Sequence, residues 1–174
     1  MSEEHARAVL LVGPVGSGKT AVAMELGELL AARGLPAAVL DLDWLGWFHG
    51  PAGAPSPDEL IVDNLQAVWP RFRSAGARYL VLARALTRAA EVHALRDALP
   101  GVEMTVALLT ASPEVIAERL GRRDQREVLR EHLEESVVMA RALDEAALED
   151  LRIDNETASV GDVAHGLLDR LGWG

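Results

Sequence analysis

The segment Gly13-Pro-Val-Gly-Ser-Gly-Lys-Thr20 has the residue types and spacing of a phosphate-binding loop, G-x-x-x-x-G-K-[ST]. Small residues let backbone N–H groups turn inward around phosphate oxygens, and a following helix points its positive end at the same anion. Lys19, the only lysine in the chain, is predicted to reach the β- and γ-phosphates, and Thr20 to place its hydroxyl on Mg²⁺. The predicted phosphate-binding residues are Gly13, Val15, Gly16, Ser17, Gly18, Lys19 and Thr20.

Asp41 and Asp43 follow the second predicted strand, at the sheet edge where ligands of parallel sheets bind. The two-residue period of a strand predicts both carboxylates on one face. Phosphoryl transfer needs a group that takes the proton of the acceptor hydroxyl and a carboxylate that holds the metal or its waters. We assign Asp43 to the acceptor and Asp41 to the metal shell. The alternative is that one of them only caps a loop.

Four arginines cluster in one segment: Arg119, Arg122, Arg123 and Arg126. Guanidinium groups stabilise the charge on a transferring phosphoryl group, and a closing lid excludes water. In a lid at about 119–130, Arg123 and Arg126 would be catalytic and Arg119 would stack on the adenine. The competing interpretation is a solvated helix whose arginines pair with glutamates at helical spacing, namely Glu118, Glu127 and Glu131.

Two further groups of residues are candidates for binding the acceptor. Arg84 and Arg88 follow the third predicted strand and are expected to bind an acidic group, unless they are ordinary surface arginines. Trp47 belongs to an aromatic group directly after Asp43, which either walls an acceptor pocket or packs its loop onto the sheet. The other members of that group are Trp44, Phe48 and His49.

The elements that must position these residues alternate short apolar runs with helical stretches, which predicts βαβ units and a parallel sheet. Strands are predicted at 8–12, 37–42, 79–83, 104–109 and around 151–153. The first helix is predicted from the phosphate loop to about 33, the second begins at 57, and the third covers about 88–99. A fourth begins at 113 and is interrupted near 121, a long fifth follows to about 149, and the last begins at about 160. Ser56 and Ser112 are predicted N-caps, and Pro70 is expected to kink its helix or end it early.

The composition of the 174 residues indicates one ordinary domain with a single core. A net charge of −10 argues against a nucleic-acid surface, and the absence of cysteine excludes disulfides and thiolate metal sites. The polar N-terminus lacks the pattern of a signal peptide, and no apolar run approaches a membrane span, so we expect a cytoplasmic protein.

A phosphate loop near the start of the chain, followed by Asp41-x-Asp43, resembles the small-metabolite kinases of the nucleoside-monophosphate-kinase-like group. Shikimate, gluconate and adenylylsulfate kinases and chloramphenicol phosphotransferase are members. The resemblance implies an α/β three-layer P-loop NTPase fold with a five-stranded parallel sheet in the order 2-3-1-4-5, covering 1–174 as one domain. In this comparison Asp43 faces the acceptor. The segment Ile153-Asp154-Asn155 resembles the adenine-side loop, which assigns Asn155 to the nucleotide.

Together these features predict a kinase that transfers the γ-phosphoryl group of ATP to a hydroxyl of a small molecule, with ATP and Mg²⁺ as cofactors. The alternative is a nucleotide-dependent regulatory ATPase acting on a protein partner. Expected partners are a nucleoside triphosphate, a small acceptor and, by resemblance, a second copy in a homodimer, with no nucleic acid or membrane. Trp44-Leu-Gly46 and Ala83-Arg84-Ala85 stand where the related kinases carry other residues, so the acceptor stays open.

Overall fold

The computed structural model describes residues 5–173 of the chain. The first four residues, on which the expectation about a signal peptide rests, lie outside the described part. The strands are β1 (Ala6–Val12), β2 (Ala37–Asp41), β3 (Tyr79–Ala83), β4 (Val102–Thr110) and β5 (Leu151–Asp154). The helices are α1 (Lys19–Ala32), the 3₁₀ helix η1 (Leu42–Gly46), α2 (Pro57–Ser74), α3 (Ala89–Asp97), α4 (Pro113–Arg123), α5 (Arg126–Ala146) and α6 (Val160–Leu171).

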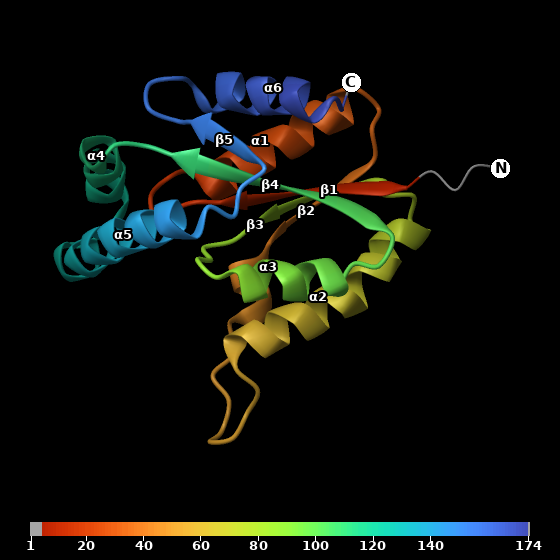
Figure 1. Cartoon of the computed structure of the whole chain (residues 1–174), viewed down its shortest axis with the longest axis horizontal. Helices are drawn as coiled ribbons and strands as arrows, with labels where there is room; N and C mark the ends of the chain where they lie inside the picture. The colour runs from red at the N-terminus through yellow and green to blue at the C-terminus, as the bar shows by residue number, and fades with distance from the viewer. Residues whose placement is uncertain (1–4, 174) are drawn as a thin grey trace.

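The five strands form one parallel sheet in the order β2-β3-β1-β4-β5, which confirms the predicted architecture. Its central strand, β1, is buried on both faces, as its continuous apolar sequence requires. Helices α1 and α6 cover one face, and α2 and α3 cover the other (Figure 1). The sheet therefore lies between two helical layers, each with its own apolar cluster.

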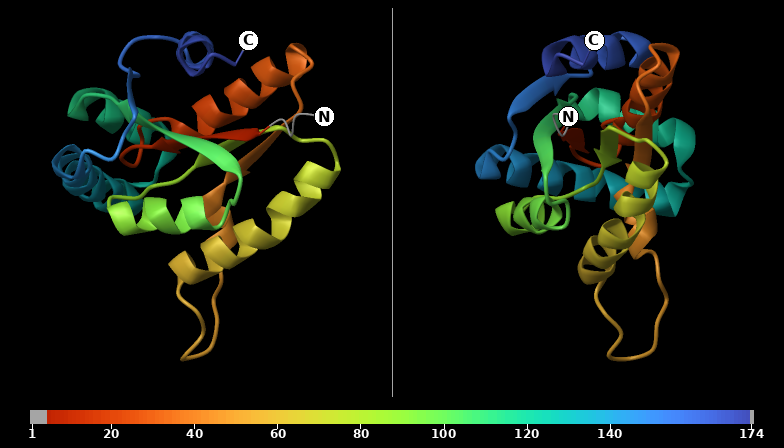
Figure 2. Two further views of the ribbon diagram at one scale, coloured as in Figure 1. Left: turned by 45° about the vertical axis from the view of Figure 1, so that its right-hand side comes forward. Right: turned by 90° about the vertical axis from the view of Figure 1, so that its right-hand side faces the viewer.

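The carboxyl ends of the strands point toward α4 and α5, which lie beyond that edge of the sheet (Figure 1). Because all strands are parallel, the segments that follow β1, β2, β3 and β5 meet at this edge. The segment 47–56 forms a long loop that projects from the start of α2 (Figures 1 and 2). The fold thus brings the phosphate loop, the paired aspartates and Arg84 to one side of the molecule.

The caps of two helices confirm the sequence prediction. Ser56 accepts a hydrogen bond from the Glu59 amide, and the Glu59 carboxylate accepts one from the Ser56 amide, which completes a capping box. Ser112 accepts a hydrogen bond from the Val115 amide at the start of α4. Helix starts were predictable because a cap depends on neighbours in the sequence alone.

One prediction about local structure was wrong. Strand β2 ends at Asp41, and Asp43 lies in η1, because the Asp41 carboxylate accepts the Asp43 amide and starts a 3₁₀ turn. At Pro70, where a kink or an early end was expected, helix α2 does not end but continues to Ser74, and the kink stays a prediction. Trp69, which precedes the proline, is buried in the core and holds the helix against the sheet. Within residues 5–173, no helix is long and apolar enough to cross a membrane.

Candidate active site

The segment 13–18 joins β1 to α1 and has the geometry of a phosphate cradle. Gly16 and Gly18 have φ angles of 82° and 94°, which L side chains rarely adopt. A Cβ atom at Gly18 would lie 2.7 Å from the Asn155 amide nitrogen, so the loop and the end of β5 approach each other closely. Lys19 is the first residue of α1, which places the start of that helix at the loop.

The Lys19 ammonium group is folded back onto its own loop. Its Nζ donates hydrogen bonds to the carbonyl oxygens of Gly13 (2.9 Å) and Pro14 (3.0 Å). Burial lowers the pKa of Lys19 to about 8, and the nearby charges of Asp43 and Asp41 act in the opposite direction. The positive charge is therefore held in a poorly hydrated position, where an arriving phosphate would stabilise it.

Asp41 links the phosphate loop to η1. Its Oδ2 accepts a hydrogen bond of 2.7 Å from the Thr20 hydroxyl, and its Oδ1 accepts the Asp43 amide at 3.2 Å. The carboxylate therefore caps η1 and also faces the expected metal position. Asp41 is the register partner of Ala83, so the carboxylate at this edge comes from β2 rather than from β3.

Asp43 reaches the same region from η1. Asp43 is exposed as a residue, but partial burial of its carboxyl group and the charge of Asp41 raise its pKa, whereas Lys19, Arg84 and the Ala85 amide oppose the rise. Asp43, Lys19, Thr20 and Ala85 all line a recess of about 380 Å³ in front of the phosphate loop. The structure thus brings both aspartates to the loop, although not through the strand period that the sequence suggested.

Asn155 and Arg119 meet on the other side of the phosphate loop. The buried Asn155 donates a 2.7 Å hydrogen bond to the Ser17 carbonyl, and Arg119 donates one of 2.7 Å to the Asn155 carbonyl. Among the described residues, four buried side-chain atoms have no hydrogen-bond partner in the protein: Ser17 Oγ, Arg84 Nε, Arg119 Nη1 and Asn155 Oδ1. All four belong to residues of the proposed nucleotide or acceptor site, so unmet hydrogen-bonding capacity is concentrated there.

The arginines of the expected lid divide into different environments. Arg123 lines the phosphate recess, but its guanidinium donates to the Asp124 carboxylate, at 2.6 Å from Nε. Hydrogen bonds from Arg123 and His132 lower the pKa of Asp124 to about 2. Arg122 pairs with Glu118, as the solvated-helix interpretation expects. Arg126 is exposed at the start of α5 and is not among the residues that line the recess.

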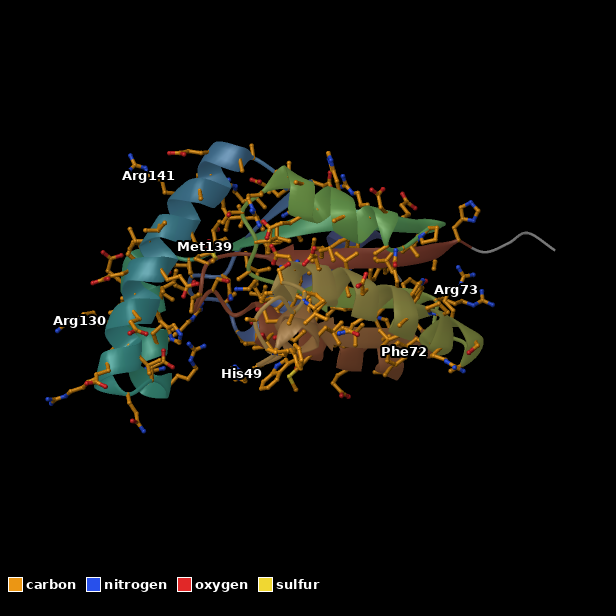
Figure 3. All side chains as sticks on the ribbon, turned by 90° about the horizontal axis from the view of Figure 1, so that it is seen from below. His49, Phe72, Arg73, Arg130, Met139 and Arg141 are labelled. Carbon is orange, nitrogen blue, oxygen red and sulfur yellow. The ribbon has the colours of Figure 1, made fainter. Side chains whose placement is uncertain are left out.

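Helix α5 presents its remaining basic residues away from the sheet. Figure 3 shows Arg130 and Arg141 on the outer side of α5, whereas Met139 packs against the core. Glu135 is a residue that the sequence analysis missed, since its negative charge acts on Lys19. Its position could not be read from the chain, because α5 reaches the loop only through the tertiary fold.

The aromatic residues after Asp43 lie on the surface. Trp44 and Trp47 are 67% and 64% exposed and stack on each other, with ring centroids 4.9 Å apart. The Trp47 indole donates a 3.0 Å hydrogen bond to His49 in the projecting loop. Neither tryptophan lines the phosphate recess or the larger neighbouring cavity, so an acceptor contact by Trp47 stays a prediction.

Arg84 is a buried arginine directly after β3, and Arg88 is exposed four residues further on, just before α3. Asp58 accepts hydrogen bonds from both, at 2.6 Å from Arg84 and 2.9 Å from Arg88. Glu91 adds a second carboxylate, 3.8 Å from Arg84 and 3.3 Å from Arg88. These partners could not be predicted from the sequence, because Asp58 comes from α2, 26 residues before Arg84.

Comparison with known proteins agrees with this architecture. The family described as AAA domain matches residues 9–144. A tunicamycin resistance protein from Deinococcus radiodurans is 23% identical, with a TM-score of 0.64 and 96% of each chain covered. Shikimate kinase from Acinetobacter baumannii is 22% identical, with a TM-score of 0.64, covering 98% of this chain and 95% of that one.

APS kinase from Mycobacterium tuberculosis, solved with AMPPNP and APS, is 22% identical over 97% of this chain and 98% of that chain, with a TM-score of 0.61. No curated protein matches the sequence significantly. The structural neighbours therefore include small-molecule kinases, and at these identities they establish the fold.

Proposed function

We propose a function for this chain, which belongs to the AAA domain family: it transfers the γ-phosphoryl group of ATP to a hydroxyl group of a small molecule. One observation carries the proposal. Asp43, a carboxylate with a raised pKa, lines the same recess as Lys19 and Thr20 of the phosphate loop. A phosphate donor site and a base for an acceptor hydroxyl therefore face each other across one small space.

The donor side would hold ATP through the phosphate loop. Inward-facing amides and the start of α1 would bind the β- and γ-phosphates, and the Lys19 ammonium would move from the Gly13 and Pro14 carbonyls to phosphate oxygens. Arg119 and Asn155, whose unpartnered atoms lie beside the loop, would contact the adenine ring of ATP. Similarity to a kinase solved with AMPPNP supports the nucleotide assignment.

The Thr20 hydroxyl and the Asp41 carboxylate would hold Mg²⁺. They are oxygen donors 2.7 Å apart at the phosphate loop, which fits a hard cation that shares its remaining positions with phosphates and water. Among residues 5–173, no cluster of three or more His, Cys, Asp or Glu could bind a metal without the nucleotide. Mg²⁺ bound there would neutralise charge on the β- and γ-phosphates.

Asp43 would act on the acceptor. The hydroxyl oxygen attacks the γ-phosphorus, its proton passes to the Asp43 carboxylate, and the bond to the β–γ bridging oxygen breaks to release ADP. A raised pKa makes Asp43 a stronger base than an ordinary carboxylate. Arg123, at the rim of the same recess, would exchange Asp124 for the charge that develops on the phosphoryl group.

The test measures acceptor-dependent ADP release by the full chain against a library of hydroxyl metabolites. Lys19→Ala should abolish release, because the charge at the phosphates is lost. Asp43→Asn should retain ATP affinity within about threefold and lower turnover by about 10²–10⁴-fold. Asp169→Asn, an exposed aspartate on α6, is the matched control and should behave as the wild type. Full turnover by Asp43→Asn on the best acceptor would exclude its role as base.

A second candidate function is a nucleotide-dependent regulatory ATPase that acts on a protein partner. The exposed aromatic group next to Asp43 favours it, since Trp44, Trp47 and Phe48 are each more than half exposed. This function predicts slow ATP hydrolysis that no small hydroxyl compound accelerates. It also predicts that Trp44→Ser combined with Trp47→Ser leaves intrinsic hydrolysis unchanged and abolishes an ATP-dependent complex. Acceleration by a small acceptor would favour the kinase.

A further inference from the structure

A cavity of about 800 Å³ lies next to the phosphate recess. The start of α2, the start of α3 and the end of the projecting loop form its walls, with Gly53, Asp58, Arg84 and Arg88 among the lining residues. Arg84 lines this cavity, and the following residue, Ala85, lines the phosphate recess. The Ala85 amide also acts on Asp43. The two spaces therefore share a wall, and a molecule in the cavity could present a hydroxyl group to Asp43.

The arginines of this cavity are already neutralised by the protein itself. The Arg84 side chain is only 5% exposed, and Asp58 and Glu91 provide its two carboxylate partners. Arg88 pairs with the same two carboxylates. Two guanidinium charges are thus matched by two carboxylates within 4 Å. The expectation that Arg84 and Arg88 bind an acidic group of the acceptor is therefore not supported by their surroundings.

Two further carboxylates, Glu59 and Asp63, line the cavity and leave it with an excess of negative charge. Glu59 is engaged in the capping box with Ser56. Asp63 is exposed and has no hydrogen bond or ion pair within residues 5–173. Arg84, which lines this cavity, also has a buried Nε that lacks a partner among the described residues.

We infer that the acceptor is a polyhydroxyl compound that carries an ammonium group, with the ammonium near Asp63 and a hydroxyl directed past Arg84 toward Asp43. An ammonium group gains from the unmatched carboxylates, whereas a carboxylate or sulfate on the acceptor meets like charge. An 800 Å³ cavity also accommodates a compound larger than one sugar ring. The inference rests on the proposed function for the phosphoryl transfer itself, but it concerns binding of the acceptor in the 800 Å³ cavity rather than in the phosphate recess.

Binding can be tested with two sets of matched probes, measured by calorimetry on the full chain with a non-hydrolysable ATP analogue. The first set is glucosamine, glucose and glucuronate, and the second is kanamycin, maltotriose and trigalacturonate. Each set has an ammonium, a neutral and a carboxylate member on similar scaffolds. In at least one set, the ammonium member should bind about three- to tenfold more tightly than the neutral member, and the carboxylate member most weakly. Equal or tighter carboxylate binding, or no ammonium binding in either set, would overturn the inference.

Removing the charge of Asp63 tests whether the ammonium group of the acceptor binds at that residue. Asp63→Asn should weaken the ammonium probe about three- to tenfold and leave the neutral probe unchanged. Asp97→Asn, at the far end of α3, is the matched control and should change neither. If Asp63→Asn leaves ammonium binding intact, the assigned position is wrong. Binding without ADP release would count against the kinase proposal alone, whereas ADP release driven by carboxylate acceptors would count against this inference alone.

Discussion

At the scale of single residues, the chemistry of the site depends on how two charges are held. Lys19 is half-buried against the carbonyls of its own loop, and Asp43 lies in the same recess with its pKa raised. The charged form of each group is less stable here than it would be in water. A phosphate next to Lys19 would stabilise its ammonium group, and a hydroxyl next to Asp43 would give its proton to the carboxylate.

The lowered pKa of Lys19 gives ATP affinity a defined pH dependence. In the free protein Lys19 loses its proton as pH rises through about 8, instead of near 10.5, and the neutral amine cannot pair with phosphate. The dissociation constant for ATP should therefore be constant below pH 7 and rise above pH 8, approaching about tenfold per pH unit. Fluorescence titration with ATP measures this, and adenosine, which lacks phosphates, is the control. ATP affinity that stays flat up to pH 9.5 would contradict the role of Lys19.

At the scale of elements, helix starts place the arginines of the site. Helix α4 carries Arg119 and Arg123, and its start is fixed by Ser112, which accepts the Val115 amide. Ser112→Ala should lower the free energy of unfolding by about 1 kcal/mol, because a first-turn amide loses its acceptor. Urea denaturation measures the change. Ser74→Ala, at the exposed end of α2, is the control, and an effect of Ser112→Ala no larger than that of the control would show that the cap is unimportant.

Most of the helices and strands, but not all of the contacts between them, could be predicted from the sequence. The strands, the sheet order, the helix caps and the phosphate loop follow from apolar periodicity, from short-range motifs and from a family resemblance. The 3₁₀ turn after Asp41 did not follow, because a side chain rather than the strand pattern directs the chain there. The pairing of Asp58 with Arg84 did not follow either, since it joins α2 to the end of β3 only in the folded protein.

At the scale of the whole molecule, the phosphate loop near the N-terminus depends on a residue that directly follows β5, the strand at one edge of the sheet. Asn155 is 138 positions from Ser17 and donates to its carbonyl in a buried contact. Asn155→Ala should lower the free energy of unfolding by about 1–3 kcal/mol, because the Ser17 carbonyl would lose its buried partner. It should also weaken ATP binding, since the loop loses its support.

The matched control for this substitution is Asn64→Ala. Asn64 also donates its side-chain amide to a backbone carbonyl, that of Leu45 at 2.8 Å, but on the surface. Water can replace that contact, so denaturation should report a smaller loss of stability. Equal losses for the two variants, with ATP affinity unchanged in Asn155→Ala, would show that Asn155 does not hold the loop.

The central proposed activity of the molecule is the transfer of a phosphoryl group from ATP to a small hydroxyl compound. The most direct measurement follows the phosphate itself, by ³¹P NMR of the full chain with ATP, Mg²⁺ and a fractionated metabolite extract. We predict that a phosphate monoester resonance appears as the γ-phosphate resonance of ATP declines, and that neither change occurs with Lys19→Ala. Conversion of the γ-phosphate to inorganic phosphate alone, in every fraction, would contradict the proposal.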